Sequence, residues 1–297
     1  MSAHALLDAA TMARLSHLAV RTPRFVTGPL SGQHRSPLHG SSIEFAEHKE
    51  YSPGDEIRNI NWRAYGKSDK YYVKRFEDET NLRAFLLVDA SASMGYAGAG
   101  TSKLLFASRL AAALSFLLLK QQDQVAVLAY GDDVRAWVPP RATSAHLGII
   151  EDALVGLEAS GGTRLDVAVR TLMEHVGRRS LVYVLSDLFE DPATIGRHLG
   201  LLGTRHQITL LHVLDPHEVE FPFDELTLFK AMESDRQVMA EPRAIRDTYL
   251  RELGRHFDAL RQTCLERGVT YARVDSGTPV ADAVVALLGG KGGGRAL

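Results

Sequence analysis

Asp89, Ser91 and Ser93 stand at alternate positions directly after a short apolar run, Phe85-Leu86-Leu87-Val88. Along an extended backbone, side chains two residues apart point to the same side, so these three oxygen-bearing groups can be directed at one point. One carboxylate and two hydroxyls form a hard-oxygen set that suits Mg²⁺ or Mn²⁺ rather than zinc or copper. The spacing therefore predicts a divalent cation site at residues 89–93.

Two further oxygen donors stand at the ends of other predicted elements. Thr163 follows the Gly-rich loop Ser160-Gly161-Gly162 and precedes a helical pattern, whereas Asp187 comes directly after the apolar run 182–185 and Ser186. In an open parallel sheet, ligands bind beyond the carboxyl ends of the strands. We therefore expect all of these donors to meet above the sheet. The expected metal ligands are Asp89, Ser91, Ser93, Thr163 and Asp187.

The chemistry expected of this set is the binding of a partner. Mg²⁺ takes octahedral oxygen coordination, and hydroxyl ligands do not neutralise it. Two carboxylates leave part of its positive charge exposed, and an open position then attracts an incoming carboxylate. A glutamate or aspartate of another protein would complete the site. Mg²⁺ is the expected ion, with Mn²⁺ and Ca²⁺ as alternatives.

The elements that must position these residues alternate between strands and helices from residue 83 onward. The predicted strands are 84–88, 125–130, 134–138, 181–185, 207–213 and 270–274. The predicted helices are 102–121, 144–157, 164–177, 192–202, 243–267 and 279–288. Three of the strands are nearly all apolar, as strands covered on both faces should be. The alternation favours an α/β fold with a doubly wound, mostly parallel sheet.

Changes in composition divide the chain into parts. Residues 1–82 hold a short amphipathic helix at 6–20, then a loop, then a small β-rich segment at 43–82. Residues 83–288 form the main domain, with an irregular insertion at about 215–242 that contains three prolines. Residues 289–297 are rich in glycine and are expected to form a flexible tail.

Composition also limits the class of protein. The formal net charge of -2 gives no electrostatic case for nucleic acid or an anionic membrane as partner. The single cysteine, Cys264, excludes a disulfide within the chain, fits a reducing compartment and is expected to be buried. The longest apolar run, residues 110–119, is far shorter than the roughly 20 residues that span a bilayer. We expect a cytoplasmic protein without a membrane span.

The motifs carry a resemblance to known families. Asp-x-Ser-x-Ser, Gly-Gly-Thr and a strand-end Asp, in this order over residues 83–288, resemble the metal-ion-dependent adhesion site of von Willebrand factor A domains. Residues 44–55, 58–63 and 73–77 resemble the bacterial family called "domain of unknown function 58". The resemblance implies a von Willebrand A-like fold and no settled activity. Because such proteins are often encoded beside MoxR-type AAA+ ATPases, it also implies a partner of that type.

Other interpretations remain open at the level of the sequence. Each motif alone has a structural explanation, because Ser and Asp are common in turns and helix caps. A metal-dependent phosphohydrolase or phosphotransferase would use Asp89 as its nucleophile and Asp187 as a metal ligand. Against it, Ser91 stands where a haloacid-dehalogenase-like pattern has a second Asp. The sequence also lacks the Gly-x-Ser-x-Gly elbow and the phosphate-binding loop of P-loop ATPases. A purely structural domain with a vestigial site would bind no metal.

Overall fold

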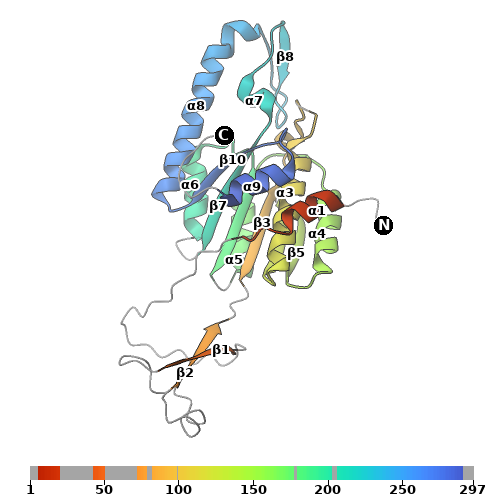
Figure 1. Ribbon diagram of the computed structural model, residues 1–297. Helices are drawn as coiled ribbons and strands as arrows, with labels where there is room; N and C mark the ends of the chain where they lie inside the picture. The colour runs from red at the N-terminus through yellow and green to blue at the C-terminus, as the bar shows by residue number, and fades with distance from the viewer. Residues whose placement is uncertain are drawn as a thin grey trace. The chain divides into compact units, whose positions relative to one another are not determined.

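Figure 1 shows the computed structural model of the chain. The structure describes residues 6–20, 43–50, 72–78, 82–98, 100–176, 179–202 and 206–289, and only the backbone of 43–50 and 72–78. The chain divides into two units, one of residues 23–81 and one that joins residues 1–22 to 82–297. The helix α1 (Ala9–Leu15) therefore belongs to the larger unit, whereas sequence composition groups it with residues up to 82.

The smaller unit contains two described strands. β1 (Ile43–Glu50) and β2 (Tyr72–Asp78) pair in antiparallel fashion, with an irregularity in register between Phe45 and Glu47. These strands fall within the segment expected to be β-rich. The polar residues 58–63, which contribute to the family resemblance, lie outside the described residues.

The larger unit is built on a six-stranded sheet in the order β10-β7-β6-β3-β4-β5. All neighbouring pairs are parallel except β4 and β5, which are antiparallel. The expected doubly wound, mostly parallel α/β fold is therefore confirmed. The strands are β3 (Arg83–Asp89), β4 (Gln124–Tyr130), β5 (Val134–Arg141), β6 (Ser180–Ser186), β7 (Gln207–Leu214) and β10 (Thr270–Asp275).

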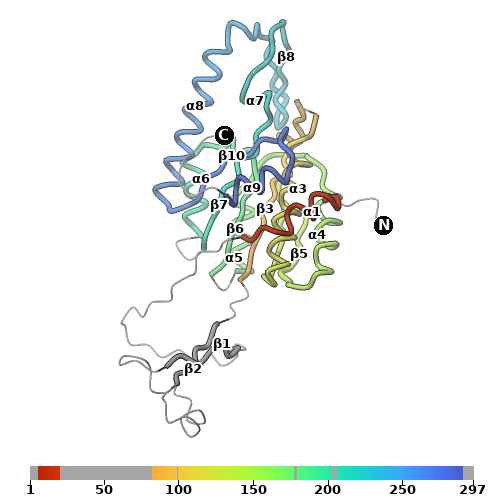
Figure 2. Tube along the Cα trace, viewed as in Figure 1, coloured from red at the N-terminus to blue at the C-terminus, as the bar shows by residue number. Residues whose placement is uncertain are grey.

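Helices cover both faces of this sheet (Figure 1). One face is covered by α1 together with α3 (Lys103–Lys120), α4 (His146–Val155) and α9 (Val280–Gly289). The other face is covered by α5 (Leu165–His175), α6 (Pro192–Leu202) and α8 (Pro242–Glu266). The trace in Figure 2 follows α1 to its place beside α3 and α9, which it contacts.

The alternation of side chains along β3 explains how this strand contributes to two hydrophobic cores, one on each face of the sheet. Ala84, Leu86 and Val88 are fully buried in the core that contains α3. Phe85 and Leu87 are buried in the core that contains α5. Successive residues of a strand point to opposite faces of the sheet. A strand that is apolar at every position therefore buries all of its side chains only when helices cover both faces. The central strand that leads to Asp89 is thus fixed from both sides.

The insertion at 215–242 contains more regular structure than the sequence indicates. It holds the short helix α7 (Pro216–Glu220) and a hairpin of β8 (Thr227–Lys230) and β9 (Gln237–Ala240). The Phe229 ring stacks on Phe221 and makes a T-shaped, edge-to-face contact with Phe223. Three prolines and very short strands leave no periodic pattern from which these elements could be predicted, and the aromatic contacts stabilise them instead.

No helix among the described residues is long and apolar enough to cross a lipid bilayer.

Candidate metal site

The Asp-x-Ser-x-Ser segment forms a tight turn at the carboxyl end of β3. The Ser91 backbone N–H donates to Asp89 Oδ1 at 2.9 Å, and the Ser91 and Ser93 hydroxyl oxygens lie 3.1 Å apart. A 3₁₀ turn, η2 (Ala92–Gly95), follows and buries Met94. The three oxygen-bearing side chains expected to converge are therefore held together by local hydrogen bonds, and Met94 anchors the turn to the core.

The Gly-Gly-Thr loop lies against this turn. The Ser160 N–H donates to the Ala90 carbonyl at 3.0 Å, and the Ala92 N–H donates to the Gly161 carbonyl at 2.9 Å. Gly161 has a φ of +71°, and a Cβ there would lie 2.1 Å from an Asp132 carboxylate oxygen. Only glycine permits this close approach. The loop thus brings the residue after Gly162, the expected ligand Thr163, to the side of the serine turn.

Asp187 enters the same region from the end of β6. The neighbouring Ser186 hydroxyl donates to Asp89 Oδ2 at 2.6 Å and accepts from the Leu188 N–H at 3.1 Å. Ser186 therefore joins the ends of β3 and β6, a role that the sequence does not reveal. The structure brings together all three segments that carry the expected ligands.

Asp89 is a buried carboxylate whose surroundings disfavour its negatively charged form. It has 0% exposure, and burial raises its pKa to about 7, with a further contribution from the negative charge of Asp187. Hydrogen bonds from Ser186 and Ser91 act in the opposite direction. Within the described part of the chain, no lysine or arginine forms an ion pair with it. A buried anion in this situation gains from a bound cation, so the donor set fits a divalent metal ion.

Lys103, the first residue of α3, lies inside the site and was not expected there. Its ammonium donates to Asp187 Oδ2 at 2.8 Å and to Glu218 Oε1 at 2.6 Å, and it lies 5.2 Å from the centre of the Phe189 ring. Burial lowers the pKa of Lys103, but the charges of Asp187 and Glu218 outweigh this effect and raise it. Asp187 therefore already has a positive partner, unlike Asp89.

A second group of acidic residues lies at the outer edge of the site. Thr163 donates its hydroxyl to Glu233 Oε1 at 2.9 Å and its N–H to Glu233 Oε2 at 3.3 Å. The Gly162 N–H donates to Asp132 Oδ2 at 3.0 Å. Burial raises the pKa of Glu190, and the charges of residues such as Glu233 add to this rise. None of these acids belongs to a motif, since each lies in a loop without periodicity.

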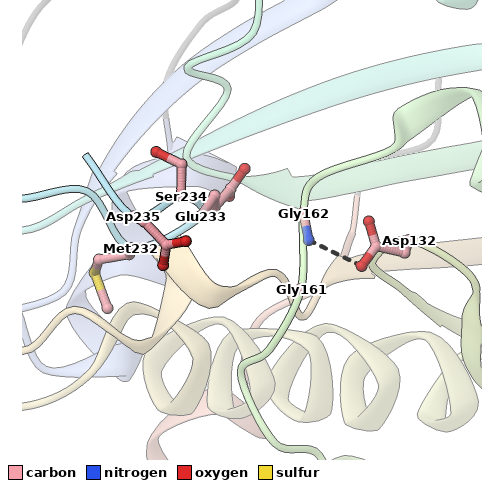
Figure 3. Close-up of a pocket in the computed structure, with 7 residues that line it drawn as sticks. All are labelled: Asp132, Gly161, Gly162, Met232, Glu233, Ser234 and Asp235. Carbon is pink, nitrogen blue, oxygen red and sulfur yellow. Dashed lines mark hydrogen bonds between the residues drawn. The ribbon is translucent and has the colours of Figure 1, made fainter.

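An open depression of about 560 Å³ separates these groups. Figure 3 shows Glu233, Ser234 and Asp235 on one side of it and Asp132 with the glycine loop on the other. No group of three or more His, Cys, Asp or Glu side chains with metal-binding geometry occurs in the described residues. The candidate donors are instead two carboxylates and three hydroxyls, oxygen groups of the kind that Mg²⁺ takes in proteins.

Comparisons with known proteins place the chain in a family. The chain is 28% identical over 254 residues to the uncharacterized protein Rv1480 of Mycobacterium tuberculosis (strain ATCC 25618 / H37Rv), a match that covers 84% of this chain and 80% of that protein. It is similar to the solved structure of the conserved hypothetical protein BatB of Bacteroides thetaiotaomicron, with a TM-score of 0.45, 13% identity, and coverage of 68% of this chain and 95% of that one. It is also similar to the von Willebrand factor type A structure from Catenulispora acidiphila, with a TM-score of 0.35, 16% identity, and coverage of 48% and 35%. The sequence model for "Protein of unknown function DUF58" matches residues 47–258, and the chain belongs to this family.

Proposed function

We propose that this protein is a protein-interaction module that binds an acidic residue of a partner through a divalent cation. The expected ligands remain Asp89, Ser91, Ser93, Thr163 and Asp187, with Mg²⁺ as the ion and Mn²⁺ or Ca²⁺ as alternatives. The observation that carries the proposal is the buried Asp89 carboxylate beside two converging hydroxyls. It has no cationic side chain as partner in the described residues.

The charges of the site support binding of an anion. When bound, the ion would supply positive charge at the turn after β3. Asp89 offsets only part of that charge, because the charge of Asp187 is already shared with Lys103 at 2.8 Å. An incoming carboxylate would therefore meet a net positive centre in surroundings of low dielectric constant, where a charged contact is stronger than in water.

The partner that we propose is a MoxR-type AAA+ ATPase. This choice depends on the resemblance to a family whose members are often encoded beside such ATPases. The sequence contains no nucleotide-binding loop of the P-loop type, so the partner would supply the nucleotide chemistry.

Thermal unfolding with and without Mg²⁺ tests the metal site directly. A ligand that binds only the folded state raises the midpoint of unfolding. We expect a rise for the wild type and none for Asp89→Asn. Asp152→Asn, which removes an exposed carboxylate on α4, should respond like the wild type. An equal response of Asp89→Asn and the wild type would place the bound metal elsewhere, and no response of the wild type would favour a structural domain without metal.

Binding of a purified MoxR-type ATPase from the same organism tests the docking mechanism. We expect binding in Mg²⁺, loss in EDTA, and loss for Thr163→Ala with the fold intact, because Thr163 lies at the rim of the sheet and not in a core. If Thr163→Ala binds the ATPase as well as the wild type does, docking through this metal is wrong.

The enzymatic alternative is disfavoured by one feature of the site. A nucleophilic Asp89 needs access to substrate, but its side chain is completely buried and both of its oxygens accept hydrogen bonds. An assay with aryl phosphates and Mg²⁺ distinguishes the two functions. Hydrolysis that disappears in Asp89→Asn would replace the docking proposal with a phosphatase.

A further inference from the structure

The hairpin of β8 and β9 brings a carboxylate within hydrogen-bond distance of a proposed metal ligand. Glu233 lies in the turn of this hairpin, and its two oxygens accept separately from the hydroxyl and the backbone N–H of Thr163, at 2.9 and 3.3 Å. Thr163 and Glu233 are separated by 70 residues, so the contact is a tertiary one. It brings an acidic side chain of the same chain to the outer, open side of the site (Figure 3).

We infer that Glu233 is an internal ligand of the site, supplied by the chain itself at the position where the acidic residue of a partner would bind. This inference rests on the proposed function. An oxygen that lies 2.9 Å from a ligand hydroxyl is close enough to share a coordination sphere with it after a small shift. A carboxylate is also the group that the proposed site should attract. The partner must then displace Glu233 before it can dock.

The base of the hairpin packs against neighbouring elements, whereas its exposed tip contacts the site through Glu233. At the base, the Phe229 ring stacks on Phe221, and Arg246 of α8 donates to the carbonyls of Phe221 and Phe223. At the tip, residues 231–236 are all exposed. The tip closes on itself through the Ala231 N–H, which donates to the Arg236 carbonyl at 2.9 Å. A segment with a packed base and an exposed tip can open locally without unfolding of the domain.

The position of the tip should depend on a divalent ion at the site, because Glu233 brings a negative charge close to other carboxylates. Glu233 approaches a region that already contains Asp132, Glu190 and Asp187, and its negative charge acts on Glu190. Without a cation, repulsion among these carboxylates opposes the contact with Thr163. A divalent ion at the site reverses this balance and holds the tip in place. The metal and the hairpin should therefore stabilise each other, while the hairpin and the partner exclude each other.

Hydrogen–deuterium exchange of residues 227–240, measured with and without Mg²⁺, tests the inference. In the wild type we expect Mg²⁺ to slow exchange of the tip amides by about tenfold, the effect of one charged contact of about 1.4 kcal/mol. Glu233→Gln keeps the length of the side chain and an oxygen that can accept from Thr163, but it lacks the charge. In this variant Mg²⁺ should still raise the midpoint of unfolding but should no longer protect the tip. Glu225→Gln removes an exposed negative charge just before the hairpin, outside the depression, and should behave like the wild type.

The outcomes separate this inference from the proposed function. If Mg²⁺ raises the midpoint of unfolding but leaves tip exchange unchanged in the wild type, the internal ligand is wrong and the metal site stands. Equal protection in Glu233→Gln and the wild type would also contradict it. If Mg²⁺ affects neither unfolding nor exchange, both ideas fail together. The internal ligand also predicts that Glu233→Gln binds the ATPase more tightly than the wild type does, because no internal carboxylate then competes with the partner.

Discussion

The ammonium of Lys103 lies 2.8 Å from the carboxylate of Asp187, and both side chains are about 1% exposed. The same ammonium reaches Glu218 of α7 at 2.6 Å, so one buried cation joins the end of β6, the start of α3 and the insertion. A buried charge is costly unless it is paired. Lys103 therefore orients Asp187 and offsets its negative charge.

Replacement of Lys103 by methionine should strongly destabilise the fold. The variant keeps the length of the side chain but leaves two acidic side chains in the interior without a cation. Removal of one partner from a buried pair costs about 3–5 kcal/mol in the free energy of unfolding. Urea unfolding measures this cost, and Lys230→Met, at an exposed lysine on β8, should change it by less than about 0.5 kcal/mol. A similar small change for Lys103→Met would contradict the pairing.

Replacement of Ser186 by alanine should show whether a residue that only orients Asp89, and does not bind the metal itself, affects metal binding. Its hydroxyl donates to Asp89 and accepts from the Leu188 N–H, so its loss leaves a buried donor unpaired, at a cost of about 1–3 kcal/mol. The rise of the unfolding midpoint with Mg²⁺ should also become smaller, because the Asp89 carboxylate is no longer oriented.

A matched control for this experiment is Ser115→Ala. The Ser115 hydroxyl is buried within α3 and donates to the Ala111 carbonyl, away from the site. This variant should leave the response to Mg²⁺ unchanged. If Ser186→Ala keeps the full Mg²⁺ response, Ser186 has a structural role only.

The main elements of the fold could be predicted because their patterns are local. The apolar strand before Asp89 and the long helix at 243–267 agree with the observed β3 and α8 to within one or two residues. The strand predicted at 134–138 continues to Arg141 through Pro139 and Pro140. Proline normally ends a strand, but β5 is an edge strand that pairs only with β4, where a missing N–H is tolerated.

The candidate site could be predicted only in part, for a related reason. Asp89, Ser91 and Ser93 are neighbours in sequence, so their spacing alone indicates that they converge. Lys103 and Glu218 are 115 residues apart, and a lysine at a helix start usually lies in solvent. Glu233 lies in an exposed turn between two very short strands. Contacts of this kind depend on the tertiary arrangement, which no periodicity or spacing encodes.

The stability of the domain should depend on the pH through Asp123, which lies outside the candidate site. Burial raises the pKa of Asp123 to about 6, and a hydrogen bond from the Leu82 N–H partly opposes this. Between its unfolded value near 4 and about 6, the folded state binds more protons than the unfolded state. The contribution of Asp123 to the free energy of unfolding therefore falls as the pH rises through this interval.

Asp123→Asn isolates that contribution, because asparagine keeps an oxygen that can accept from Leu82. Relative to the wild type, we expect the variant to gain stability between pH 4 and pH 6.5 and to show no further relative gain above about pH 7. Thermal midpoints measured over this range provide the comparison. A difference between the two proteins that is constant with pH would show that Asp123 titrates normally in the folded state.

Cys264, the single cysteine, should report on opening of the core between α8 and the sheet. It is buried against residues such as Leu260, and burial raises its pKa to about 12, so at neutral pH it is a protonated, inaccessible thiol. The thiolate is the reactive form, and we therefore expect no reaction with an aromatic disulfide reagent in the native protein. In increasing urea, the fraction of reactive thiol should follow global unfolding measured by circular dichroism, because α8 is packed over the sheet by the same core. Reaction well before the main transition would show that α8 separates from the sheet first, and the domain would then not unfold in a single step.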